Sequence, residues 1–112
     1  MAAGQRCTSI RRLFLQRGIA AEMTEYLVKS WDKVRVGHPL DEKTLCGPLI
    51  DTHAVRKMEA GLAEARTQGG EVLFGGGRVE LDYEGKPLLG GCYVRPALVR
   101  AHPSMPVVKE EI

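Results

Sequence analysis

Two stretches of the chain carry apolar residues at the spacing of an amphipathic helix. In the first, from Ile19 to Val36, apolar residues recur every three or four places and charged residues fill the positions between them, so that one face is apolar. Gly37 and Pro39 then end the pattern, because proline cannot continue the helical hydrogen bonds. The apolar positions are Ile19, Met23, Leu27, Trp31 and Val34, and we expect the central three to lie in the core.

A loop separates this helix from the second one. Residues 38–50 contain two prolines and a Gly47-Pro48 pair, which disfavour regular structure. Asp51 then occupies the position of an N-cap, where its carboxylate can accept hydrogen bonds from the free amides of a first helical turn. Gly69-Gly70 ends the pattern. The predicted apolar stripe of the second helix consists of Val55, Met58, Leu62 and Ala65.

Three short apolar runs predict β-strands, at Arg11–Leu15, Glu71–Phe74 and Cys92–Val99. Pro96 lies within the third run and removes a backbone donor, so that run is expected at an edge or a bulge. The polar residues 78–91 are predicted to be partly a hairpin. The resulting order of strand, helix, helix, strand, strand indicates an α/β fold.

The composition is that of an ordinary globular segment. The 112 residues are 44% hydrophobic and 27% charged, which disfavours disorder and coiled coil. A net charge of +2 provides no basic field for nucleic acid. No apolar run approaches the roughly 20 residues that cross a bilayer. We therefore expect a soluble chain of one domain at most, with neither a nucleic-acid nor a membrane partner.

The cysteines indicate a reducing compartment. They are three, an odd number, and are far apart without C-x-x-C spacing. The first seven residues lack the basic and apolar regions of a signal peptide, so we expect a cytoplasmic location. Cys46 and Cys92 are interpreted as small packing residues. The spacing of the potential ligands matches no structural zinc pattern, so no metal site is predicted from Cys46, Cys92, His38, His53 and His102.

Two short segments invite a functional interpretation. Gly75-Gly76-Gly77 follows a predicted strand but lacks the G-x-G-x-x-G order of a phosphate loop, so a turn is expected. In Gly4-Gln5-Arg6-Cys7-Thr8, a cation precedes the cysteine, and a nearby glycine leaves room for a substrate to approach the sulfur. These features suit a nucleophilic Cys7. On the residues alone, a packing cysteine and a surface arginine remain the simpler interpretation.

Several motifs in order resemble those of the aldehyde dehydrogenase superfamily. Gly4–Cys7 resembles its G-Q-x-C active-site motif, and Glu110–Ile112 resembles the start of its E-x-F-G-P segment. Between them lie counterparts of its V-G-x-P-x-D loop, its G-P-hydrophobic stretch and its Y-x-x-P-T-hydrophobic strand, at Val36–Asp41, Gly47–Ile50 and Tyr93–Val99. Arg6-Cys7-Thr8 with Arg11-Arg12-Leu13 is similar to the antiquitin branch, the α-aminoadipic semialdehyde or piperideine-6-carboxylate dehydrogenases.

The resemblance implies oxidation of an aldehyde, with a semialdehyde as one candidate, to a carboxylic acid with NAD or NADP as cofactor. Cys7 would be the catalytic nucleophile, passing through a thiohemiacetal and a thioester, and its backbone amide would stabilise the oxyanion. Glu111 would be the cofactor-binding residue, with its carboxylate on the nicotinamide ribose. Arg6 would be the substrate-binding residue, in contact with the polar end of the aldehyde.

The resemblance also implies how much of the enzyme this chain contains. Residues 1–112 are expected to be part of the three-layer catalytic domain, without the cofactor-binding and oligomerisation segments of a parent that forms a homo-oligomer. The chain alone is then expected to be inactive. The alternative is a truncated, non-catalytic product or an interaction module.

Overall fold

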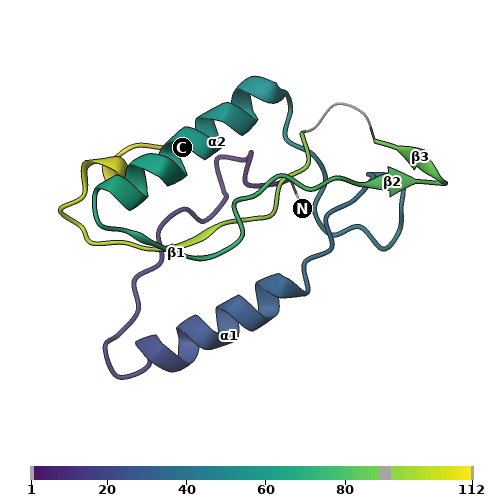
Figure 1. The fold of residues 1–112 in the computed structure, drawn as a ribbon. Coiled ribbons are helices and arrows are strands. Elements are labelled where there is room, and N and C mark those ends of the chain that lie inside the picture. The colour runs from purple at the N-terminus through teal and green to yellow at the C-terminus, as the bar shows by residue number, and fades with distance from the viewer. Residues whose placement is uncertain (1, 89–91, 112) are drawn as a thin grey trace.

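The computed structural model describes residues 2–88 and 92–111, in which two helices flank a narrow antiparallel ribbon (Figure 1). Both helices contact the strand β1, one from each side (Figure 1). This layered arrangement of helix, ribbon and helix confirms the α/β class. The elements in chain order are α1 (Ala20–Asp32), α2 (Thr52–Thr67), β1 (Glu71–Phe74), β2 (Asp82–Tyr83), β3 (Lys86–Pro87), β4 (Leu98–Arg100) and the 3-10 helix η1 (Pro106–Lys109).

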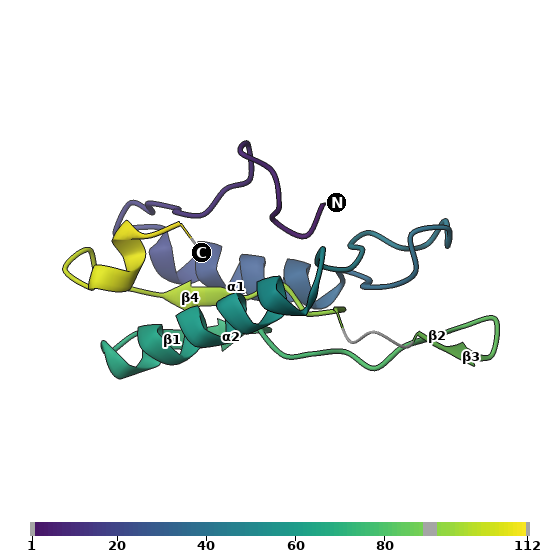
Figure 2. The same ribbon diagram turned by 90° about the horizontal axis from the view of Figure 1, so that it is seen from above.

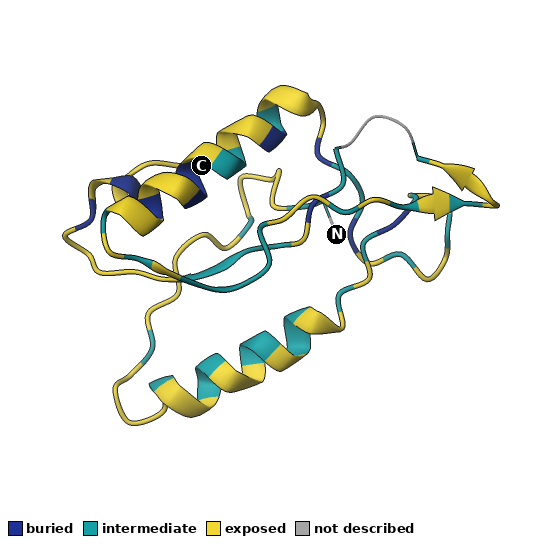
Figure 3. Ribbon diagram, in the orientation of Figure 1, coloured by how far each residue is buried: buried dark blue, intermediate teal, exposed yellow. Residues whose placement is uncertain are grey.

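The first predicted helix forms, but it is shorter than predicted and its stripe is not core. It ends at Asp32 because Lys33 caps it, and residues 35–37 turn away to pair with Cys46. The Gly37 N–H donates to the Cys46 carbonyl at 3.0 Å. No residue of α1 is buried (Figure 3), since the two-stranded ribbon is too narrow to cover the helix face. Met23, Leu27 and Trp31 are half-buried.

The second predicted helix and its cap are confirmed. The Asp51 carboxylate accepts a hydrogen bond of 2.7 Å from the Ala54 N–H, which satisfies one of the free amides of the first turn. Three members of the predicted stripe are buried, and Met58 is half-buried. Two of them, Val55 and Ala65, belong to two small apolar clusters. The first contains Leu49, Val55 and Val94, and the second contains Ala65, Met105 and Val107.

The ribbon pairs β1 with β4 in antiparallel register, Val72 opposite Val99, with an irregularity before Phe74. Beyond that irregularity the pairing resumes between residues 76–79 and 93–95, where the Arg95 N–H donates to the Gly77 carbonyl at 2.9 Å. Pro96 lies between these two paired stretches, where it has no N–H to donate, and β4 begins only at Leu98, so it is shorter than the predicted run. Gly75 has a φ of +69°, and any Cβ there would collide with the Pro96 carbonyl. Gly75 therefore passes too close to the Pro96 backbone for any larger residue.

The predicted hairpin is β2 and β3. Its two turn residues, Glu84 and Gly85, both have positive φ, at 52° and 73°, which is the pattern of a type I′ turn. The rest of the polar segment, at 89–91, lies outside the described residues. Next to the hairpin, the ring of Tyr83 stacks on that of His38 at a centroid distance of 4.2 Å.

The strand predicted at Arg11–Leu15 is wrong. These residues pair with no strand in the part of the chain that the structure describes, and Leu13 and Phe14 are 55% and 83% exposed. An apolar run becomes a strand only where another strand accepts its hydrogen bonds. Here the segment instead runs past the C-terminal turn, seen from above in Figure 2, and its arginines bind that turn.

Across residues 2–88 and 92–111, no helix is long and apolar enough to cross a membrane.

Candidate functional site

Cys7 lies on a tight turn near the N-terminus. The Ser9 N–H donates to the Arg6 carbonyl at 2.9 Å, and the Arg6 N–H donates to the Ser9 hydroxyl oxygen at 3.3 Å. Cys7 and Thr8 occupy the two central positions of the turn. The turn leaves Cys7 exposed to solvent.

Gln5 fixes this turn to the segment that precedes α2. Its side-chain NH₂ donates to the Pro48 carbonyl at 3.3 Å, and its side-chain oxygen accepts from the Ile50 N–H at 2.8 Å. An amide side chain can do both because it carries a donor and an acceptor. Ala3 adds an apolar contact with the first cluster. Sequence reasoning quoted Gln5 as part of a motif but assigned it no role.

Gly4 is needed for its backbone conformation. Its φ is +78°, in the left-handed region that favours glycine, whereas a Cβ built there would meet no atom within 4 Å. From the sequence, Gly4 is explained by the room that it leaves for a substrate. The positive φ of Gly4 is by itself a sufficient reason for a glycine at this position.

The C-terminal residues are brought to the same place by α2. The Val107 N–H donates to the side-chain oxygen of Gln68 at 2.9 Å, which holds η1 against the end of α2. The Lys57 ammonium then donates to the backbone carbonyl of Glu111 at 3.1 Å. Arg12 adds a contact from the N-terminal segment, since its guanidinium donates to the Val108 carbonyl at 2.6 Å. Glu111 is thereby held beside the Cys7 turn.

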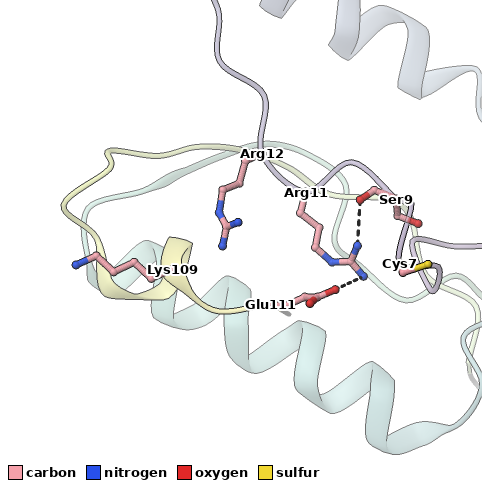
Figure 4. Close-up of a pocket in the computed structure, with 6 residues that line it drawn as sticks. All are labelled: Cys7, Ser9, Arg11, Arg12, Lys109 and Glu111. Carbon is pink, nitrogen blue, oxygen red and sulfur yellow. Dashed lines mark hydrogen bonds and ion pairs between the residues drawn. The ribbon is translucent and has the colours of Figure 1, made fainter.

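One open cavity of about 540 Å³ contains both Cys7 and Glu111 (Figure 4). Three of its six lining side chains are cationic and one is a carboxylate, so the cavity favours an anionic ligand. Arg6 does not line it. The lining residues are Cys7, Ser9, Arg11, Arg12, Lys109 and Glu111.

Arg11 connects the two sides of this cavity, and sequence reasoning missed it. Its guanidinium lies 3.1 Å from a Glu111 carboxylate oxygen, in an ion pair, and 3.0 Å from the Ser9 carbonyl (Figure 4). In the sequence, the Arg11-Arg12 pair indicates only the start of a strand and a similarity to the antiquitin branch. No sequence pattern places an arginine near the start of the chain beside a glutamate near its end.

The other two cysteines pack as predicted. Cys46 is 2% exposed, and its burial raises the pKa of its thiol. Cys92 is half-buried and packs against the first apolar cluster. Within the described ranges, no three His, Cys, Asp or Glu side chains come close enough together to hold a metal ion.

The chain is similar over almost its whole length to known proteins. The α-aminoadipic semialdehyde dehydrogenase of Mus musculus is 40% identical over 111 residues, covering 97% of this chain and 19% of that protein. HpcC from Thermus thermophilus superposes with a TM-score of 0.88 at 30% identity, over 97% of this chain and 21% of that one. Betaine aldehyde dehydrogenase from Staphylococcus aureus, solved with NAD⁺, superposes with a TM-score of 0.86 at 29% identity, over 97% and 21% of the two chains.

The chain thus spans about a fifth of the length of the proteins it matches. The model of the aldehyde dehydrogenase family matches residues 1–112, which is the whole chain. With this match from end to end, the chain belongs to the aldehyde dehydrogenase family.

Proposed function

We propose that this segment supplies the nucleophile and one cofactor contact to an enzyme that oxidises an aldehyde to a carboxylic acid with NAD or NADP. The observation that carries the proposal is the cavity shared by Cys7 and Glu111. Residues 1–112 would then be part of the catalytic domain. Because the chain spans about a fifth of its relatives' length, we expect it to have no dehydrogenase activity by itself.

In this proposal Cys7 carries the covalent chemistry. Its thiolate forms a C–S bond with the aldehyde carbon, and the carbonyl π electrons move to oxygen to give an oxyanion. The backbone N–H of Cys7 donates to that oxyanion. Its collapse restores the C=O bond and releases hydride, leaving a thioester that water cleaves to the carboxylic acid and the thiol.

The residues present fit a nicotinamide cofactor. The Glu111 side chain is 68% exposed, and one of its oxygens pairs with Arg11, which leaves acceptor positions for ribose hydroxyls. The excess of cations in the cavity suits the negative charge of a dinucleotide. When bound, the nicotinamide supplies the hydride acceptor.

For the substrate, we propose a semialdehyde with an anionic end. The name of the mouse relative supports this class. Arg6 would contact the anionic end, since its side chain is exposed next to Cys7 and does not line the cavity with Glu111. Arginine suits a carboxylate because its planar fork binds both oxygens.

The test is a substitution in a full-length aldehyde dehydrogenase that carries this segment. Cys7→Ser should abolish aldehyde-dependent reduction of NAD or NADP, and Cys92→Ala, the matched control, should leave the rate within about twofold. A Cys7→Ser enzyme that keeps its rate would rule out Cys7 as the nucleophile. An equal loss of rate in a folded Cys92→Ala enzyme would contradict the assignment of the nucleophile to Cys7 alone.

A further inference from the structure

We infer that Arg11 is a positioning residue that orients the Cys7 backbone amide and the Glu111 carboxylate with one guanidinium group. The inference rests on the proposed function, because it concerns how the proposed nucleophile and its oxyanion donor are held. It assigns a role to a side chain that the reaction itself does not use.

All four terminal N–H bonds of Arg11 have acceptors. Nη1 donates to the carbonyls of Arg6 and Ser9, at 3.2 and 3.0 Å. Nη2 donates to the Gly4 carbonyl at 3.0 Å and pairs with Glu111 Oε1 at 3.1 Å. Two of the four acceptors belong to the backbone of the Cys7 turn, and a third, the Gly4 carbonyl, lies just before it. The fourth lies at the other end of the chain.

The contact with the Arg6 carbonyl matters most for chemistry. That carbonyl and the Cys7 N–H belong to the same peptide unit, which is planar and, like every described peptide bond, trans. In a trans peptide the C=O and N–H point in opposite directions. When Arg11 holds the carbonyl on its own side, the Cys7 N–H is directed away from Arg11, and its direction is fixed.

The Glu111 contact joins the two halves of the cavity. The Arg11 side chain is 28% exposed and the Glu111 side chain 68%, so the pair by itself contributes little to stability. Its effect is on geometry, because the guanidinium that orients the Cys7 turn also fixes the position of the Glu111 carboxylate. Lysine cannot replace this arrangement, since an ammonium has three donors at one point rather than a planar fork.

The test uses an ester, so that it needs no cofactor. A nucleophilic Cys7 with an oxyanion donor must also cleave p-nitrophenyl acetate, because acylation by an activated ester requires no hydride acceptor. In the full-length enzyme without NAD or NADP, Arg11→Lys should lower the ester hydrolysis rate about ten- to a hundredfold, somewhat less than the loss of a whole oxyanion donor. Arg100→Lys, which alters an exposed pair with Glu71 that does not line the cavity, is the matched control and should change the rate less than about twofold.

Two further measurements separate orientation from folding. Arg11→Lys should raise the hydrogen-exchange rate of the Ser9 amide while circular dichroism stays as in Arg100→Lys. Guanidinium at millimolar concentration should restore ester hydrolysis to Arg11→Ala, and ammonium should not. Equal rescue by both ions would overturn the inference, because charge without the fork would then suffice.

The failure of this inference differs from the failure of the proposed function. If Cys7→Ser removes ester hydrolysis while Arg11→Lys keeps it within about twofold, the role of Arg11 is overturned and the nucleophile stands. If Cys7→Ser keeps ester hydrolysis, the proposed nucleophile itself is wrong.

Discussion

The side-chain oxygen of Gln5 accepts a hydrogen bond of 2.8 Å from the backbone N–H of Ile50, which fixes the Cys7 turn to the segment just before α2. The same side chain donates to the Pro48 carbonyl. Gln5 therefore pairs with one donor and one acceptor on a neighbouring segment. A residue with only acceptors cannot satisfy both.

Gln5→Glu should therefore detach the turn. A carboxylate keeps the bond from Ile50 but faces the Pro48 carbonyl with a second acceptor, so we expect a loss of about 1 kcal/mol in the free energy of unfolding, measured with urea. Gln16→Glu, at an exposed position, is the control for the added charge. Equal effects of the two substitutions would show that charge rather than the paired hydrogen bonds is responsible.

The three cysteines should differ in their rates of alkylation by iodoacetamide. Cys7 is exposed and should react first, whereas Cys46 is 2% exposed and should react last. Because burial raises the pKa of the Cys46 thiol, its thiolate fraction at any given pH is lowered, and its reaction should begin at a higher pH than in the unfolded chain. Peptide mass mapping after timed labelling measures all three rates. In urea the order should disappear, and an order that persists there would refute the structural explanation.

The Glu59–Arg78 pair should make stability depend on pH. Arg78 donates to both carboxylate oxygens of Glu59, at 2.7 and 3.1 Å, and this lowers the pKa of Glu59. A lowered pKa in the folded state means that the contribution is complete above the unfolded pKa and is lost as the pH falls through the folded value. Glu59→Gln should remove this dependence of the free energy of unfolding on pH in the acid range.

The carboxyl carbon of Glu59, followed by NMR during acid titration, reports this pKa directly. Arg78→Ala should return it toward the ordinary value, and Arg66→Ala, which removes an exposed arginine on the same helix as Glu59, is the control. A titration unchanged by Arg78→Ala would contradict the assignment of the shift to that arginine.

Gly75 and Gly77 should respond differently to alanine. Gly75 has a φ of +69° and a Cβ there collides with the Pro96 carbonyl, so we expect Gly75→Ala to cost at least about 2 kcal/mol. At Gly77 no atom lies within 4 Å of an added Cβ, and Gly77→Ala should change stability by less than about 0.5 kcal/mol. Urea unfolding measures both. Similar losses at the two sites would argue against the close passage beside Pro96.

The features predicted well from the sequence are those that depend on neighbouring residues. The Asp51 cap and the apolar stripe of α2 lie within a few turns of one another, so the local pattern determines them. The break in pairing at Pro96 follows from the missing donor of that residue. The strand prediction at Arg11–Leu15 is wrong because a strand needs a partner that the pattern cannot supply.

In the candidate site too, the local features can be predicted from the sequence and the long-range contacts cannot. Motifs predict Cys7 and Glu111 as site residues, but their presence on one cavity depends on how α2 and η1 fold back. The contacts of Gln5 with residues 48–50 and of Arg11 with Glu111 join segments distant in sequence. Such pairs become visible only when the chain is folded, because no local spacing relates them.

The cavity is built from residues that are synthesised at different times. A ribosome makes chains from the N-terminus, so the turn with Cys7 emerges long before Glu111. The segment from Pro48 through α2, to which both ends are bonded, emerges between them. A nascent chain that has not yet received Glu111 exposes Cys7 with only one wall of its cavity. The second wall and the thiol can therefore meet only after translation has passed the last of these residues.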